Sequence, residues 1–139
     1  MNSYKFEDIK VGLEEEFSVK VDSEKLNKFL EISGDINPLH VDSEYSKSKG
    51  FIDRVVYGML TSSFYSTLVG VYLPGKYCIL QGIDIQFSKP VYINDTLKLS
   101  GKVSYINEAY KQIEIKAMIT NQDNKKVSKA TIKVGLMDE

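Results

Sequence analysis

Residues 58–73, GMLTSSFYSTLVGVYL, contain no charged side chain, and this stretch constrains the fold more than any other. It is long enough for about four helical turns, and its polar members are only small hydroxyls and tyrosines. A helix without a charged face is a buried helix, because no side of it gains from contact with water. The rest of the chain is therefore expected to wrap around a central helix.

After Pro74-Gly75 the hydrophobic period changes to two, which predicts strands. Short turn-forming segments divide residues 79–136 into four amphipathic strands, and a further strand is expected around residues 16–21. The side chains expected on the buried faces are Ile79, Ile83, Ile85 and Phe87; Leu97, Leu99, Val103 and Tyr105; Ile113, Ile115, Ala117 and Ile119; and Ala130, Ile132, Val134 and Leu136. The predicted fold class is α+β, with an antiparallel sheet curled around the central helix.

A shorter amphipathic helix is expected earlier in the chain. Asp22 or Ser23 can cap its N-terminus, and hydrophobic residues follow at helical spacing. Gly34 is expected to end this helix, because glycine adopts the left-handed backbone that commonly closes a helix.

The segment SGDINPLH, residues 33–40, follows this helix and holds the only histidine, His40. Pro38 has no amide hydrogen and biases Asn37 toward extended backbone, so residues 35–40 are expected to form a loop. A single helical turn over residues 43–48 is expected next.

Composition narrows the class of protein. At 139 residues and 42% hydrophobic content the chain has the size of one domain, expected to span residues 1–139. The 18 basic and 19 acidic residues nearly cancel, so neither a nucleic acid nor a membrane surface is expected as a partner. The lone cysteine, Cys78, is expected to be a small buried residue, and the N-terminus lacks a signal-peptide pattern. A cytoplasmic location is predicted.

Three features predict acid/base chemistry. Asp35 and His40 lie five residues apart, and the ordinary pKa of histidine, about 6.5, suits proton transfer near neutrality. Gly58 opens the central helix, where the first amide hydrogens have no partner within the helix and carry partial positive charge. Without a Cβ, Gly58 also lets a substrate oxygen come close.

Each of these residues also has a purely structural interpretation. Asp35 could form a local turn with the amide of Asn37, and a lone histidine is often structural. A calcium loop is excluded, because His40 stands where such a loop needs glycine and Ser46 where it needs glutamate. A serine nucleophile is disfavoured, because the hydroxyls of the central helix lack the required turn motif. No metal is expected.

The two blocks SGDINPLHVDSEYSKSKGF and RVVYGMLTSSFYSTLVG closely resemble the MaoC-like, (R)-specific enoyl-CoA hydratase family. The resemblance covers nearly the whole chain. It implies a single hot-dog domain, in which an antiparallel sheet wraps a long helix, and assembly as a homodimer or a higher oligomer. The implied reaction is reversible addition of water to a trans-2-enoyl thioester, carried on coenzyme A or an acyl carrier protein, without a further cofactor.

The resemblance also implies roles for single residues. Asp35 and His40 would bind one water and deliver its hydroxide and its proton to the double bond. The Gly58 amide would be the oxyanion-hole donor, and Ser66 matches a serine that supports the site in related hydratases. Asn37 would shape the loop.

Tyr57 departs from the family pattern, because many members have histidine before the glycine. Tyr57 is therefore expected to narrow or re-polarise the pocket and to influence substrate preference. Two alternatives stay open: a thioesterase of the same fold, and a non-catalytic protein that binds acyl thioesters.

Overall fold

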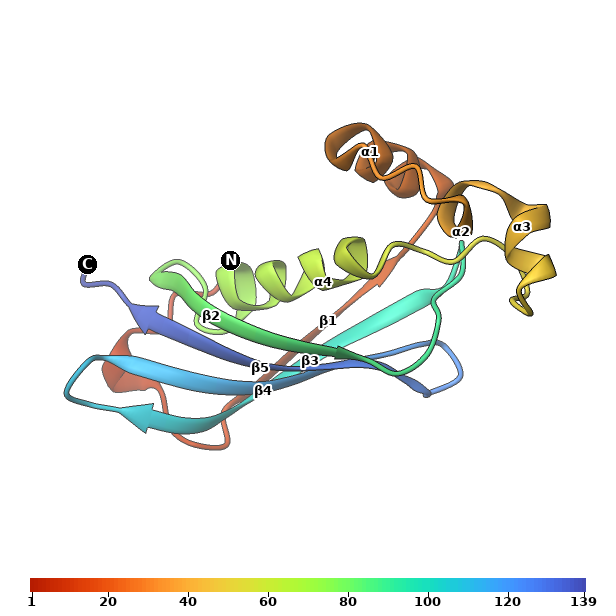
Figure 1. Cartoon of the computed structure of the whole chain (residues 1–139). Helices are drawn as coiled ribbons and strands as arrows, with labels where there is room; N and C mark the ends of the chain where they lie inside the picture. Colours follow the sequence, from red (N-terminus) through yellow and green to blue (C-terminus); the bar gives the residue numbers. More distant parts are fainter.

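One long helix lies against the concave face of a five-stranded antiparallel sheet in the computed structural model, which describes all of residues 1–139 (Figure 1). The strand order is β1-β3-β4-β5-β2, so β1 and β2 form the two edges of the sheet. The strands are β1 (Glu14–Lys20), β2 (Cys78–Phe87), β3 (Thr96–Asn107), β4 (Gln112–Thr120) and β5 (Lys126–Leu136). The predicted α+β, hot-dog architecture is confirmed.

The central helix begins where it was predicted to begin. It comprises α4 (Gly58–Thr67) and a π-helical continuation, η2 (Leu68–Tyr72). One side packs on the sheet through fully buried residues such as Tyr65, Leu68 and Val69. The prediction that the helix is buried on every side is wrong for the single chain: Met59 is 63% exposed, and Ser63 and Ser66 on the same face are also exposed. The sheet of one chain covers only one side of α4.

Three helices gather beyond one end of the sheet, while both termini lie near the other end (Figure 1). The first, α1 (Ser23–Ser33), begins and ends as predicted: Asp22 caps it by accepting from the Lys25 amide, and Gly34 closes it with φ 68°. The second and third are α2 (Pro38–Val41) and α3 (Ser43–Ser48). A short 3-10 turn, η1 (Phe6–Asp8), precedes β1.

The prediction of a continuous loop over residues 35–40 is wrong at its second half. Asn37 has the expected non-helical backbone, but it caps α2, and its side-chain oxygen accepts from the Leu39 amide at 2.9 Å. Pro38 is the first helical residue, where the missing amide hydrogen has no helical partner to lose. His40 therefore lies on a helical turn, which fixes its direction more firmly than a loop would.

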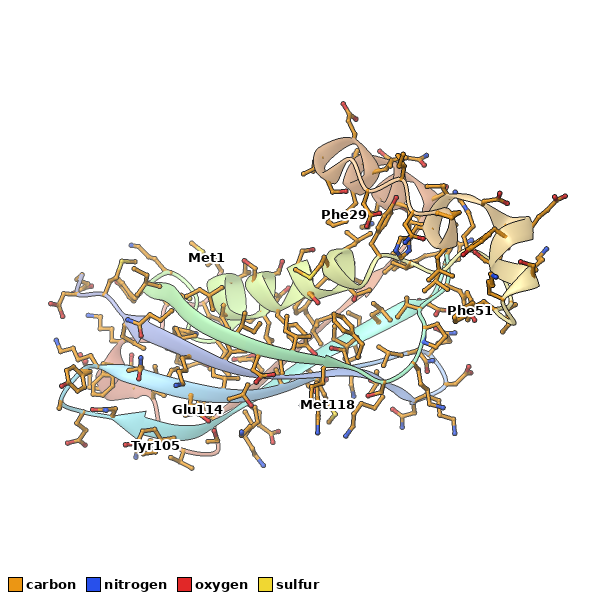
Figure 2. All side chains as sticks on the ribbon, viewed as in Figure 1. Met1, Phe29, Phe51, Tyr105, Glu114 and Met118 are labelled. Atoms are coloured by element: carbon orange, nitrogen blue, oxygen red, sulfur yellow. The ribbon has the colours of Figure 1, made fainter.

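Two β-bulges reverse the predicted alternation. A bulge between Leu80 and Gly82 places Ile79 opposite Gly135 and puts Leu80 opposite the buried Val134 instead. A second bulge, between Val103 and Tyr105, turns Tyr105 outward, where it is 56% exposed and points away from α4 (Figure 2). Each extra residue shifts the period by one, so the residues beyond it change face.

The remaining predicted core positions of β3, β4 and β5 are at most 8% exposed. Cys78 is half-buried, and burial raises its pKa to about 11, as expected of a packing residue. None of the helices combines the length and the apolar character needed to cross a membrane.

Candidate active site

His40 is held by a hydrogen bond that defines its tautomer. Its Nδ1 lies 2.7 Å from the backbone carbonyl oxygen of Val55. A carbonyl oxygen can only accept, so Nδ1 carries the proton and donates it. In the neutral ring Nε2 then keeps its lone pair, and it forms no hydrogen bond within the protein. The arrangement leaves Nε2 available as a base.

A cavity of about 310 Å³ brings His40 and Gly58 together. Most of its wall is apolar, and it lies at the end of the molecule where α2 meets α4. The lining residues are Leu39, His40, Phe51, Val55, Val56, Gly58, Thr61, Phe87, Ser88, Lys89, Pro90, Val91 and Val127. Two of the residues predicted from the sequence thus share one cavity.

Gly58 is the first residue of α4, and no side chain caps this helix. The Tyr57 carbonyl accepts from the amides of Leu60 and Thr61, so the helix itself does not use the Gly58 amide. An uncapped helix N-terminus carries partial positive charge, as a developing oxyanion requires. The Phe87 ring crowds this point: a Cβ on Gly58 would lie 3.0 Å from Phe87 Cε1.

Asp35 is exposed and does not line this cavity. Its Oδ1 accepts from the Asn37 amide at 3.0 Å, which is the local turn that the structural interpretation anticipated. The second carboxylate oxygen accepts no hydrogen bond from the protein. Asp35 is nevertheless tied to the site through its backbone, because its carbonyl oxygen accepts from the Tyr57 hydroxyl at 2.9 Å.

Tyr57 is only 2% exposed and lies behind His40, outside the cavity. Its ring packs at a tilt against His40, with the centroids 4.2 Å apart, and against Phe29 of α1, with the centroids 4.8 Å apart. Tyr57 therefore does not narrow this cavity by direct contact, and its predicted effect on polarity and substrate preference stays a prediction. Burial raises the pKa of the Tyr57 hydroxyl, and the charge of Asp35 raises it further.

Ser66 is not brought together with the other predicted residues. It lies on the exposed face of α4, about two turns beyond Gly58, and does not line the cavity. Ser62, one turn after Gly58, is 6% exposed, and its buried hydroxyl has no hydrogen-bond partner.

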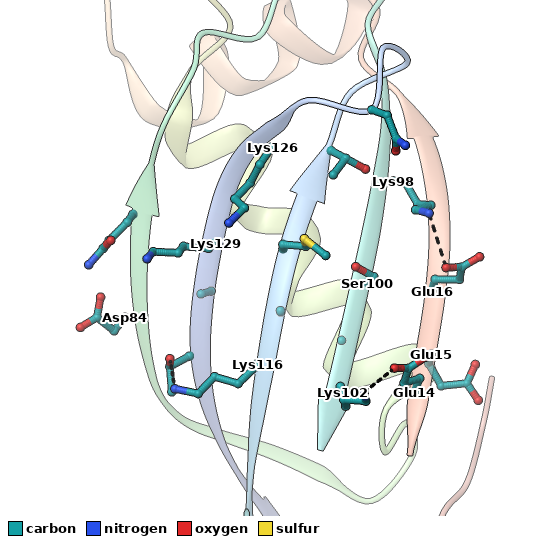
Figure 3. Close-up of a pocket in the computed structure, with 18 residues that line it drawn as sticks. Glu14, Glu15, Glu16, Asp84, Lys98, Ser100, Lys102, Lys116, Lys126 and Lys129 are labelled. Atoms are coloured by element: carbon teal, nitrogen blue, oxygen red, sulfur yellow. Dashed lines mark hydrogen bonds and ion pairs between the residues drawn. The ribbon is translucent and has the colours of Figure 1, made fainter. Parts of the chain in front are cut away.

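A larger hollow of about 950 Å³ lies on the opposite, outward face of the sheet (Figure 3). Its lining includes five lysines and four carboxylates, so their charges nearly balance. Several are paired, as in Lys102–Glu14 at 3.0 Å and Lys98–Glu16 at 3.8 Å. None of the residues predicted for the site lies there, and we interpret it as the solvated face of the sheet.

Sequence reasoning missed the aromatic wall of the cavity, Phe51 and Phe87. Phe51 follows α3, at the same end of the molecule as Phe29 (Figure 2). Phe87 ends the edge strand β2 on the same side of the sheet as α4, and it is 55% exposed. The sequence signal for Phe87 is its position at the end of an apolar alternation, just before Pro90, which indicates the end of a strand where a side chain can reach a cavity.

Comparisons with known proteins identify similar sequences and a matching family. A family model described as MaoC like domain matches residues 5–127. The (R)-specific enoyl-CoA hydratase of Aeromonas caviae is 32% identical over 100 residues, which cover 72% of this chain and 75% of that protein. The mitochondrial 3-hydroxyacyl-(acyl-carrier-protein) dehydratase of Arabidopsis thaliana is 39% identical over 75 residues, which cover 54% of this chain and 44% of the plant protein.

Solved structures are similar over nearly the full length. The unliganded R-hydratase PhaJ1 of Pseudomonas aeruginosa superposes with a TM-score of 0.90 at 27% identity, covering 97% of this chain and 86% of that one. The (R)-hydratase of Aeromonas caviae gives a TM-score of 0.88 at 28% identity, covering 93% of this chain and 98% of that one.

Proposed function

This chain belongs to the MaoC-like domain family, and from that premise we propose that it is an (R)-specific enoyl-CoA hydratase. The reaction is the reversible addition of water across the double bond of a trans-2-enoyl thioester, giving an (R)-3-hydroxyacyl thioester. The observation that carries the proposal is the shared cavity, which is lined both by an imidazole whose Nε2 forms no hydrogen bond within the protein and by the uncapped start of a helix.

His40 is the acid/base residue in this proposal. Nε2 takes a proton from water as the water oxygen bonds to the β-carbon, and the protonated Nε2 then returns that proton to the α-carbon, which restores the neutral ring. Because the Val55 carbonyl fixes the proton on Nδ1, the ring presents the correct nitrogen without reorganisation. General acid/base transfer of this kind contributes roughly a hundredfold to ten-thousandfold to the rate.

The Gly58 amide binds the thioester oxygen. Negative charge develops on that oxygen as the enolate-like transition state forms, so a fixed donor stabilises the transition state more than the substrate. One such donor contributes about 3 kcal/mol. The mainly apolar cavity wall suits the acyl chain next to the thioester.

Because Asp35 is exposed and does not line the cavity, we propose that the attacking water lies at the rim of the cavity, between the Asp35 carboxylate and His40. The carboxylate oxygen that the local turn leaves free supplies the acceptor. Hydration involves no net redox change and no covalent intermediate, so we propose no metal or redox cofactor. The carrier, coenzyme A or an acyl carrier protein, is part of the substrate. The cytoplasmic location stays a prediction.

We also propose a homodimer, formed through β2 and the open face of α4. β2 is an edge strand with exposed apolar side chains, including Ile83 at 40% and Phe87 at 55%. Met59 on α4 is 63% exposed on the face that the sheet leaves open. Exposed apolar edges of this kind are normally covered by a partner.

The activity is tested with purified protein and a series of trans-2-enoyl thioesters of graded length, on both carriers. Hydration removes the absorbance of the conjugated thioester. Asp35→Asn and His40→Ala are each expected to lower kcat by about a hundredfold or more. Asp123→Asn, at an exposed aspartate in the turn between β4 and β5, is the matched control and is expected to keep full activity.

Three outcomes would contradict the proposal. Release of free thiol without hydration would identify a thioesterase. Tight thioester binding without turnover would identify a non-catalytic binding protein. Full activity in both the Asp35 and His40 variants would remove the proposed acid/base roles.

A further inference from the structure

Tyr57 connects the two segments that carry Asp35 and His40. It is the last residue before α4, and its ring is packed between Phe29 of α1 and His40 of α2. At 2% exposure, the side chain has one position available to it. The hydroxyl at its tip reaches the Asp35 carbonyl oxygen, 22 residues earlier in the chain.

The segment that contains Asp35 has little else to hold it. Asp35 and Ile36 are exposed, and Ile36 is 76% exposed despite its apolar side chain. The other hydrogen bonds of Asp35 are local, to the Ser33 hydroxyl and the Asn37 amide. The bond from Tyr57 is therefore its single hydrogen bond to a distant part of the chain. Without this bond, the segment would move relative to His40.

We infer that Tyr57 is a positioning residue that sets Asp35 and His40 relative to one another, with its hydroxyl fixing the Asp35 segment and its ring fixing the imidazole. This role rests on the proposed function and deepens it. In this role Tyr57 acts through Asp35 and His40 and does not contact the acyl chain, since it does not line the cavity. A tyrosine hydroxyl is protonated near neutral pH and can donate, and burial, which raises the pKa of Tyr57, favours the same protonated form.

The decisive variant is Tyr57→Phe. It removes only the hydroxyl oxygen and keeps the ring in contact with Phe29 and His40. We expect kcat to fall about five- to tenfold, because a misplaced carboxylate slows the chemical step. We expect KM to change less than about twofold, because the substrate does not contact this side chain. A residue that acted by contact with the acyl chain would change KM instead.

Tyr65→Phe is the matched control. Tyr65, within α4, is another buried tyrosine, and its hydroxyl forms one long-range hydrogen bond, 2.9 Å to Ser128 Oγ. The control loses a similar bond far from Asp35, so we expect lower stability with unchanged kcat. Circular dichroism of both variants verifies the fold.

Hydrogen exchange provides a readout that does not depend on activity. The backbone amides of residues 35–37, 39 and 40 are expected to exchange about five- to tenfold faster in Tyr57→Phe and at the wild-type rate in Tyr65→Phe. In the unaltered protein, a slowly exchanging Tyr57 hydroxyl proton in contact with the Asp35 backbone would be visible by NMR, which tests the bond without any variant.

These measurements separate the two proposals. A wild-type protein without hydratase activity overturns the proposed function, while hydrogen exchange still decides whether Tyr57 fixes the Asp35 segment. If Tyr57→Phe matches Tyr65→Phe in both kcat and the exchange of residues 35–40, the positioning role is overturned.

Discussion

In the proposed mechanism, the absence of a side chain at Gly58 matters more for substrate binding than for the stability of α4. The first residue of a helix tolerates alanine well, and a methyl group there would meet only the Phe87 ring, 3.0 Å away at Cε1. That ring is 55% exposed and ends an edge strand, so it can shift by a few tenths of an ångström. We expect the methyl group also to obstruct the cavity side of Gly58, where the substrate oxygen must approach the amide.

Gly58→Ala is therefore expected to separate stability from activity. We predict a change in free energy of unfolding below about 1 kcal/mol, measured by urea denaturation. We predict a fall in kcat/KM of roughly tenfold or more, because the thioester oxygen can no longer reach the amide. Adding Phe87→Ala relieves the ring contact and is expected to leave kcat/KM low. Recovery of activity in the double variant would assign the defect to packing.

Tyr65 predicts how stability depends on alkaline pH. Burial raises its pKa from 10.0 to about 12 in the folded protein. Below pH 10 its contribution to stability is fully present, and it is lost as the pH rises from about 10 to 12, because the unfolded chain releases the proton first. The loss is about 2 to 3 kcal/mol. Urea unfolding at several pH values is expected to show a shallower decline for Tyr65→Phe, and equal slopes would contradict the shift.

Among the elements, α2 is short and carries the catalytic candidate His40. A helix of four residues has little stability of its own, so its start depends on the Asn37 cap at 2.9 Å from the Leu39 amide. Asn37→Ala is predicted to destabilise the protein by about 1 kcal/mol and to lower kcat, because the imidazole loses its support. Asn37→Ser, which can cap the same amide, is predicted to recover most of both. If kcat is the same in Asn37→Ala and Asn37→Ser, α2 is held in place mainly by packing and not by the Asn37 cap.

The elements whose patterns are uninterrupted could be predicted from the sequence. β4 carries its four predicted core residues at 6% exposure or less, and α1 begins and ends at its predicted caps. The bulges in β2 and β3 could not be predicted, because the pairing of neighbouring strands selects the extra residue and the sequence holds no separate signal for it. α2 was missed because proline was interpreted as a helix breaker at the one position where it starts a helix.

The reacting groups of the candidate site could be predicted from the sequence, but the hydrogen bonds that hold those groups in place could not. His40 and Gly58 were identified by residue type and spacing, and the structure places them on one cavity. The Val55 carbonyl that fixes the histidine tautomer is a backbone atom, so no side-chain pattern reveals it. The bond from Tyr57 to the Asp35 carbonyl joins residues 22 positions apart and likewise depends on the fold.

At the scale of the whole molecule, a single chain does not bury all of the residues that its hydrophobic pattern predicts to be buried. The charge-free stretch that predicts a helix buried on every side has an open face at Met59, Ser63 and Ser66. The adjoining edge strand presents Ile83 and Phe87 toward the same side of the sheet. Both departures are explained together if a second copy covers them, and the same contact would close the side of the cavity formed by Phe87.

Ile83→Lys is predicted to dissociate the proposed homodimer. A lysine at this position places a charge in the centre of the contact, where burial without a partner is costly. Light scattering after size exclusion is expected to give the mass of one chain for the variant and of two for the wild type. Met118→Lys is the matched control: Met118 is 41% exposed, close to the 40% of Ile83, but lies on the outward face of the central strand β4. It is expected to stay dimeric.

Because Phe87 belongs to both the contact and the cavity, the dissociated variant is also expected to lose hydratase activity. A fully active monomer would show that one chain completes the site alone.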